Sequence, residues 1–134
     1  MKMGALLLAG GLMDHDDPLY EEGRDGARSL IDIHGKPMVQ WVINALDASQ
    51  SVRDLYIIGL PPEIDIETTK QVHFLPDAGG LFENIRAGVL RAAEDNPDQK
   101  RVLVVSSDIP ALRPEMVDWL ADQVGSDSQS LIFY

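Results

Sequence analysis

The sequence has no cysteine among its 134 residues, and it has few basic side chains. Without cysteine there is no disulfide framework, no thiolate metal site and no cysteine nucleophile. Eleven Lys and Arg against 22 Asp and Glu give a formal net charge of −11. A chain of that charge repels polyanions, so we expect it to bind neither nucleic acid nor an anionic membrane surface.

Long apolar segments are also missing, and none approaches the roughly 20 residues of a membrane span. We therefore expect a cytoplasmic protein. Two common nucleotide-binding signatures are absent, since no G-x-x-x-x-G-K-[ST] motif occurs and Gly11 is not followed by G-x-x-G spacing. P-loop ATPases and dinucleotide-dependent dehydrogenases are disfavoured for that reason. No pairing of carboxylates in the sequence identifies a general acid and base.

The pattern of apolar residues predicts an α/β fold. Short, near-continuous apolar runs are typical of strands buried on both faces, and longer segments with a period near 3.6 are typical of amphipathic helices. Their alternation predicts a Rossmann-like, three-layer α/β/α domain with a mainly parallel sheet and right-handed crossovers. The expected strands are 5–9, 55–58, 72–75 and 102–105, and the expected helices are 37–49, 81–96 and 114–124.

Two further stretches are an acidic loop and the end of the chain. Residues 14–28 are acidic and contain glycine, so we expect a mobile surface loop. The last residues, "SLIFY" at 130–134, resemble a strand with nothing after it to turn the chain or cover its face. We therefore expect residues 1–134 to be one domain, truncated at its C-terminus. Exposed apolar surface on Trp119 and on this last run would then indicate a homo-oligomer contact or the truncation itself.

The ends of two predicted strands bear the candidate site, because ligands of open α/β sheets bind beyond the carboxyl ends of the strands. Gly10 and Gly11 follow the first strand, where backbone N–H groups can approach a ligand or the chain can turn tightly. Asp108 follows the last long strand, where it either holds Mg²⁺ against a phosphate or caps the next turn. Arg28 and Lys36 supply positive charge, as phosphate ligands or as ordinary surface residues.

Four segments together resemble the MobA-like nucleoside-triphosphate transferases, of the molybdenum-cofactor guanylyltransferase type. They are "LLLAGG", "ARSLIDIHGKPMVQWVINAL", "LPDAGGLFENIRAGV" and "LVVSSDIPALRPEMVDWL", and they cover most of the chain in the family's order. The resemblance implies the nucleotide-diphospho-sugar transferase fold. It also implies a Mg²⁺-dependent nucleotidyltransferase, which moves a nucleoside monophosphate from a nucleoside triphosphate to a small phosphorylated acceptor and releases pyrophosphate.

The resemblance further implies roles for the residues that match the family's motifs. Asp108 matches the Mg²⁺-binding aspartate, and Arg28 stands where the family usually has a lysine that meets the triphosphate or the acceptor phosphate. Both are expected to be catalytic. The expected nucleotide-binding residues are Leu8, Ala9, Gly10, Gly11, Arg28, Lys36, Gly79, Gly80 and Asn84.

Two features depart from the family's pattern. Many members follow the glycine pair with a compact loop that contains an arginine, whereas this chain has the acidic stretch "LMDHDDPLYEEGRDG". Arg28 keeps the charge of the usual lysine but not its geometry. Two alternatives therefore stay open: a non-catalytic nucleotide-binding or interaction module, and a glycosyltransferase-like domain for a nucleotide-sugar. The second usually has a D-x-D motif, and "SSDIP" has a single aspartate.

Overall fold

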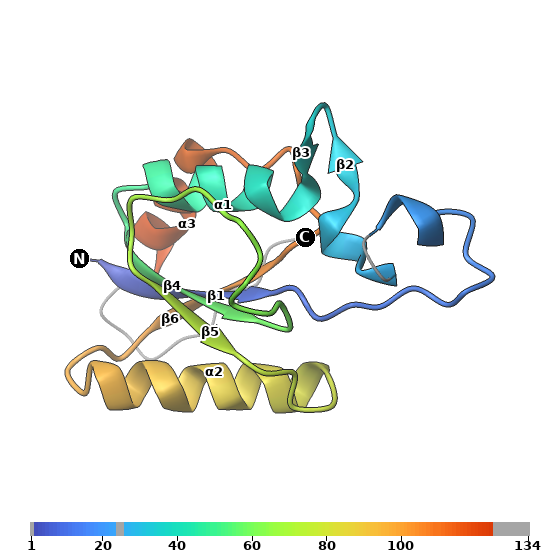
Figure 1. Cartoon of the computed structure of the whole chain (residues 1–134). Helices are drawn as coiled ribbons and strands as arrows, with labels where there is room; N and C mark the ends of the chain where they lie inside the picture. Colours follow the sequence, from blue (N-terminus) through green and yellow to red (C-terminus); the bar gives the residue numbers. More distant parts are fainter. Residues whose placement is uncertain (1, 24–25, 125–134) are drawn as a thin grey trace.

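The computed structural model describes residues 2–23 and 26–124. Its parallel sheet is built from four strands, β1 (Met3–Leu8), β4 (Val52–Ile58), β5 (Val72–Leu75) and β6 (Val102–Ser106), in the order β5-β4-β1-β6. Three α-helices pack on it within the described residues: α1 (Met38–Ala48), α2 (Leu81–Asp95) and α3 (Pro114–Gln123). Figure 1 shows α1 and α3 on one face of the sheet and α2 on the other. The predicted three-layer α/β fold with a parallel sheet is confirmed.

The central strands are apolar on both faces because helices cover both faces. Ala5 and Leu7 of β1 belong to the core cluster under α1 and α3, whereas Leu6 packs with Tyr56 of β4 on the side of α2. All four side chains are fully buried. Side chains of a strand alternate between faces, so a run of apolar residues without alternation is what a doubly covered sheet requires.

Helix α2 packs on the sheet through small residues, and only Gly88 and Ala92 of the apolar stripe that its period predicts are buried. The buried residues are Asn84, Gly88 and Ala92, whereas Leu81 at the start of the helix is 68% exposed. A Cβ on Gly88 would lie 2.3 Å from the side chain of Leu6. Glycine therefore sets the spacing between this helix and β1, and the larger apolar residues are displaced from the contact.

A small hairpin that the sequence pattern does not predict precedes α1. It pairs β2 (Asp32–Ile33) with β3 (Lys36–Pro37) in an antiparallel arrangement. The turn between them has positive φ at both residues, 50° at His34 and 84° at Gly35, and the N–H of Gly35 donates to the Asp32 side chain at 2.9 Å. Strands of two residues are too short to show periodicity, which explains why this element was missed.

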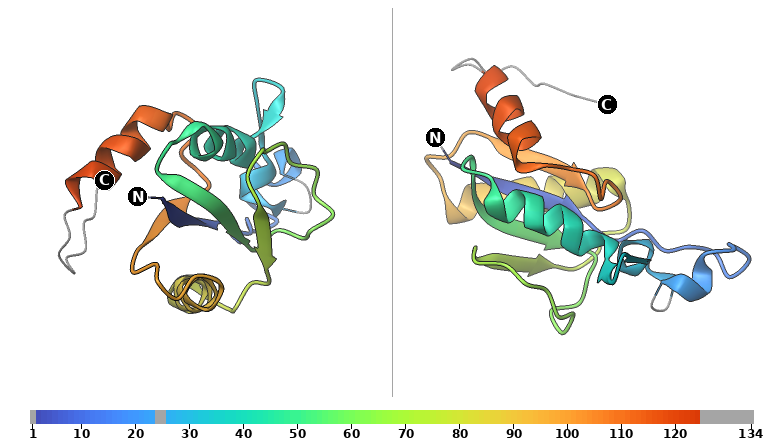
Figure 2. Two further views of the ribbon diagram at one scale, coloured as in Figure 1. Left: turned by 90° about the vertical axis from the view of Figure 1, so that its left-hand side faces the viewer. Right: turned by 90° about the horizontal axis from the view of Figure 1, so that it is seen from above.

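The acidic loop after the glycine pair is closed at its base. Leu12 pairs with Ala27 in an isolated antiparallel bridge, and the backbone N–H of Arg28 donates to the carbonyl of Gly11 at 3.1 Å. Met13 is buried within the loop. Figure 2 shows the loop projecting beyond the sheet. The contacts at its base bring Ala27 and Arg28 back beside the glycine pair. Short 3₁₀ helices span Tyr20–Glu22 (η1) and Arg28–Leu30 (η3).

Three expectations concern membrane-spanning helices, the surface of α3 and the last residues of the chain. None of the described helices is long and apolar enough to cross a membrane. Trp119, on the polar side of α3 in the predicted helix, is 52% exposed. The strand expected at 130–134 lies outside the described residues.

A partly buried polar network joins β4 and β5 to the C-terminal end of α2. The ring of Tyr56 stacks on His73 at 4.5 Å between centroids, and its hydroxyl donates to Oδ2 of Asp95 at 3.0 Å. Nε2 of His73 lies 3.1 Å from Oδ2 of Asp54. Burial, the hydrogen bond to Asp95 and the negative charge of Asp54 raise the pKa of Tyr56 far above its ordinary value of 10.0.

We predict that Tyr56 makes the protein less stable in alkali. Folded Tyr56 keeps its proton to higher pH than the unfolded chain does. Its stabilising effect is therefore complete below about pH 10 and is lost as the pH rises further, by at most about 1.4 kcal/mol per pH unit. Tyr56→Phe should remove this dependence and lower the free energy of unfolding at pH 7 by about 1 kcal/mol. Urea unfolding of both proteins across this range measures the difference, and an equally steep fall in the variant would contradict the assignment.

Candidate functional site

An open pocket of about 310 Å³ lies beyond the carboxyl ends of β1 and β6. This is a switch point in the strand order, because the chain continues from β1 to β4 on one side and later to β6 on the other side of β1. Ligands of open α/β sheets collect at such a switch point. The pocket is lined by Leu8, Gly10, Gly11, Arg28, Ser29, Asp77, Gly79, Gly80, Leu81, Asn84, Ser106, Ser107 and Asp108.

The glycine pair places backbone donors in this pocket. Within the described residues, no protein acceptor is found for the N–H groups of Gly10 and Gly11. Gly10 is also enclosed by two other strand ends, since a Cβ there would lie 3.3 Å from Oδ2 of Asp77 and 3.4 Å from Cα of Gly59. The missing side chains thus let the chain pass through a narrow space and leave its N–H groups available to a ligand.

Arg28 enters the pocket from the far side of the glycine pair, on η3. Its backbone N–H donates to the Gly11 carbonyl, and the neighbouring Ser29, which is buried, donates from Oγ to the carbonyl of Ala9 at 3.2 Å. These two bonds tie η3 to the end of β1. The guanidinium makes no ion pair or hydrogen bond with any described residue. It is therefore available to an anionic ligand.

Asn84 and Asp77 organise the turn between β5 and α2. The Asn84 side-chain amide donates to Oδ1 of Asp77 at 3.2 Å, and its oxygen accepts the N–H of Ala78 at 2.6 Å. The N–H of Gly79 also donates to Oδ1 of Asp77, at 2.9 Å. Both ends of the Asn84 amide are thus engaged within the protein, while Oδ2 of Asp77 faces Gly10 in the pocket. Asp77 is a pocket-lining acceptor that sequence reasoning missed.

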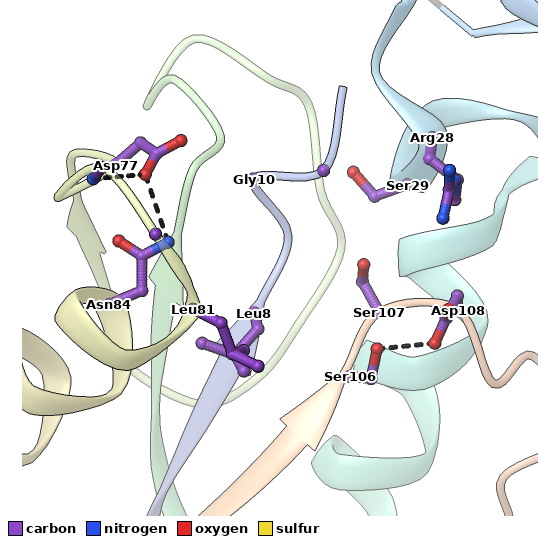
Figure 3. Close-up of a pocket in the computed structure, with 13 residues that line it drawn as sticks. Leu8, Gly10, Arg28, Ser29, Asp77, Leu81, Asn84, Ser106, Ser107 and Asp108 are labelled. Atoms are coloured by element: carbon purple, nitrogen blue, oxygen red, sulfur yellow. Dashed lines mark hydrogen bonds between the residues drawn. The ribbon is translucent and has the colours of Figure 1, made fainter. Parts of the chain in front are cut away.

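Asp108 stands on the wall opposite Asp77 (Figure 3). Its Oδ1 accepts a hydrogen bond from Oγ of Ser106 at 2.5 Å, and the backbone is anchored by the N–H of Ser107, which donates to the Leu8 carbonyl at 3.2 Å. Among the described residues no group of three or more His, Asp or Glu could hold a metal ion. Mg²⁺ needs no such group, because it prefers one or two carboxylates together with phosphate oxygens and water. The hard oxygen ligands at this wall fit Mg²⁺ in company with a phosphate.

Most of the predicted site residues line this one pocket, but Ala9 and Lys36 do not. Ala9 is buried, with its carbonyl taken by Ser29. Lys36 lies on the hairpin, with Nζ 4.9 Å from the centre of the Trp41 ring, a cation–π contact. A role for Ala9 or Lys36 in nucleotide binding stays a prediction. The lining residues that sequence reasoning missed are Ser29, Asp77, Leu81, Ser106 and Ser107.

Comparison with known proteins gives one family and several solved structures. The family model of the MobA-like NTP transferase domain matches residues 5–134. No curated protein matches the chain. A solved structure described as a hypothetical transferase from Thermus thermophilus is 31% identical, with a TM-score of 0.73 over 94% of this chain and 48% of that chain.

Two further solved structures share the fold at lower identity. A 4-diphosphocytidyl-2C-methyl-D-erythritol synthase is 19% identical, with a TM-score of 0.66 over 93% of this chain and 54% of that chain. A CMP:2-keto-3-deoxy-manno-octonic acid synthetase complexed with CTP is 17% identical, with a TM-score of 0.62 over 92% of this chain and 47% of that chain. The chain spans about half the length of these three structures. Because the family model covers all but the first four residues, the chain belongs to the MobA-like NTP transferase domain family.

Proposed function

We propose that the pocket binds a nucleoside triphosphate together with Mg²⁺, and that the protein transfers the nucleotidyl group to a small phosphorylated acceptor. The observation that supports this best is that two kinds of phosphate-binding group and one candidate Mg²⁺ ligand meet in one pocket. These are the N–H groups of Gly10 and Gly11, the guanidinium of Arg28 and the carboxylate of Asp108. Family membership and a structural neighbour solved with CTP agree with a nucleotide ligand.

The charges of the pocket suggest how the nucleotide lies in it. The carboxylate of Asp77 repels phosphates, whereas the guanidinium of Arg28 on the other wall attracts them. We therefore expect the triphosphate to lie toward Arg28, with Mg²⁺ between it and Asp108, and the nucleoside to lie toward Asp77 and the start of α2. There Oδ2 of Asp77 can accept hydrogen bonds from the sugar or the base, and the exposed side chain of Leu81 offers apolar surface.

The proposed reaction forms one bond and breaks one bond at the α-phosphorus of the triphosphate. A phosphate oxygen of the acceptor attacks this phosphorus, the bond to the oxygen that bridges to the β-phosphorus breaks, and pyrophosphate leaves with the electron pair. An ionised phosphate needs no general base, so this step requires no acid–base pair from the residues of the pocket.

Catalysis of this kind is mostly positioning and charge neutralisation. Arg28 would steady the negative charge of the phosphates, and the backbone donors of Gly10 and Gly11 would fix the nucleotide against the end of β1. Asp108 would hold the Mg²⁺ ion, which supplies charge neutralisation when bound.

The proposal is tested by calorimetric titration of the chain with GTP, CTP, ATP and UTP, each with and without Mg²⁺. One triphosphate is expected to bind selectively, and its affinity should fall at least about tenfold when the metal is removed. Pyrophosphate release with a panel of phosphorylated sugars and cofactor precursors is then measured. Tight binding without release would favour a non-catalytic nucleotide-binding module, and the absence of binding to all four would contradict the proposal.

A further inference from the structure

A short hydrogen bond orients the carboxylate of Asp108. Oγ of Ser106 donates to Oδ1 of Asp108 at 2.5 Å, the length of a charge-assisted bond between a hydroxyl and a carboxylate. Both side chains are exposed, and both line the pocket (Figure 3). The bond therefore belongs to the pocket wall and not to the core.

The backbone under this pair is fixed, whereas the carboxylate itself has little else to hold it. Ser106 pairs with Leu8 in the parallel ladder, and the N–H of buried Ser107 continues that pairing. Asp108 forms no ion pair with any described residue. An exposed aspartate without partners samples several rotamers. The Ser106 hydroxyl is thus the contact that restricts the carboxylate.

We infer that Ser106 is a positioning residue for the metal site, which rests on the function proposed above. By occupying Oδ1, its hydroxyl holds the Asp108 carboxylate in one orientation and leaves Oδ2 for the cation. A ligand that is already oriented loses less entropy when the metal binds, and hydrogen-bonding partners of metal ligands commonly change metal affinity by 10- to 100-fold. Because Ser106 and Asp108 are exposed, loss of their hydrogen bond should change the free energy of unfolding little, and its main effect should be on the binding of the metal.

The test compares Ser106→Ala with Ser106→Thr in the full chain. Mn²⁺ serves as the probe, followed by electron paramagnetic resonance in the presence of GTP, CTP, ATP or UTP. Ser106→Ala is expected to weaken Mn²⁺ binding about tenfold, and Ser106→Thr, which keeps the hydroxyl, should restore it. The melting temperature should stay unchanged in both variants, and the loss of triphosphate affinity in Ser106→Ala should be larger with metal than without it.

Two results would overturn the role of Ser106 without contradicting the proposed function. One is Mn²⁺ affinity in Ser106→Ala equal to that of the unaltered chain. The other is an equal loss in Ser106→Thr, which would mean that the side chain matters through packing and not through its hydroxyl. Absence of metal-dependent triphosphate binding in the unaltered chain would contradict the proposed function as well, so the two failures are distinguishable.

Discussion

Asp108→Asn is expected to abolish the Mg²⁺ dependence of triphosphate binding. Asparagine has nearly the same shape and can still lie beside Ser106, but it has no negative charge to hold a divalent cation. Affinity measured with Mg²⁺ should fall by about 10- to 100-fold, to the value that the unaltered chain shows without metal. Transfer of the nucleotidyl group should fall by about 100-fold or more, because loss of about 3 kcal/mol of charge stabilisation corresponds to that factor.

The matched control is Asp122→Asn. Asp122 is exposed near the end of α3 and does not line the pocket, so this variant has the same change in net charge without altering the proposed metal ligand. Its Mg²⁺ dependence should equal that of the unaltered chain in the same calorimetric titration. Mg²⁺ dependence that survives in Asp108→Asn would contradict the assignment. In that case we would expect Asp77→Asn, which changes the other carboxylate that lines the pocket, to lose the Mg²⁺ dependence of triphosphate binding.

The main elements of the fold could be predicted because their signals are local. A strand such as 102–105 is apolar throughout, and the structure confirms it as β6. Burial of polar residues could not be predicted in the same way. Gln40 lies among polar residues of α1, yet it is buried because its side-chain amide donates to the carbonyl of Glu67 at 2.7 Å and accepts the Glu67 N–H at 3.0 Å. Such a pairing joins residues 27 positions apart, which no local pattern reveals.

The sequence located pocket-lining residues where they followed a recognisable strand, and their roles stay predictions. Gly10, Gly11 and Asp108 were found through the rule that ligands collect at the carboxyl ends of strands, and all three line the pocket. Asp77 follows β5 in the same manner, so the same rule could have found it. Ser29 and the pairing of Ser106 with Asp108 have no sequence signal, because an isolated serine has the same appearance in a pocket as on any surface.

Gly59→Ala is expected to displace the glycine pair by direct contact with Gly10, although Gly59 does not line the pocket. Gly59 directly follows β4 and has φ of 98°. A Cβ there would lie 2.2 Å from Cα and 2.4 Å from N of Gly10, and 3.0 Å from the carbonyl carbon of Ala9. All three are backbone atoms, so the clash is relieved only when the backbone of Ala9 and Gly10 or that of Gly59 shifts. Strain at positive φ costs about 1–2 kcal/mol and overpacking typically costs about 1–3 kcal/mol. We expect a loss of about 3 kcal/mol in the free energy of unfolding, and at least tenfold weaker triphosphate binding.

Gly35→Ala is the matched control, because it separates backbone strain from the clash. Gly35 has φ of 84°, but no atom lies within 4 Å of a Cβ placed there. This variant should lose about 1–2 kcal/mol of stability and keep its affinity for the triphosphate. Urea unfolding and calorimetric titration of both variants measure the two effects. Equal stability losses with unchanged affinity in Gly59→Ala would show that β1 can move without disturbing the site. A selective loss of affinity would mean that the packing of β4 against β1 positions the backbone donors of the pocket.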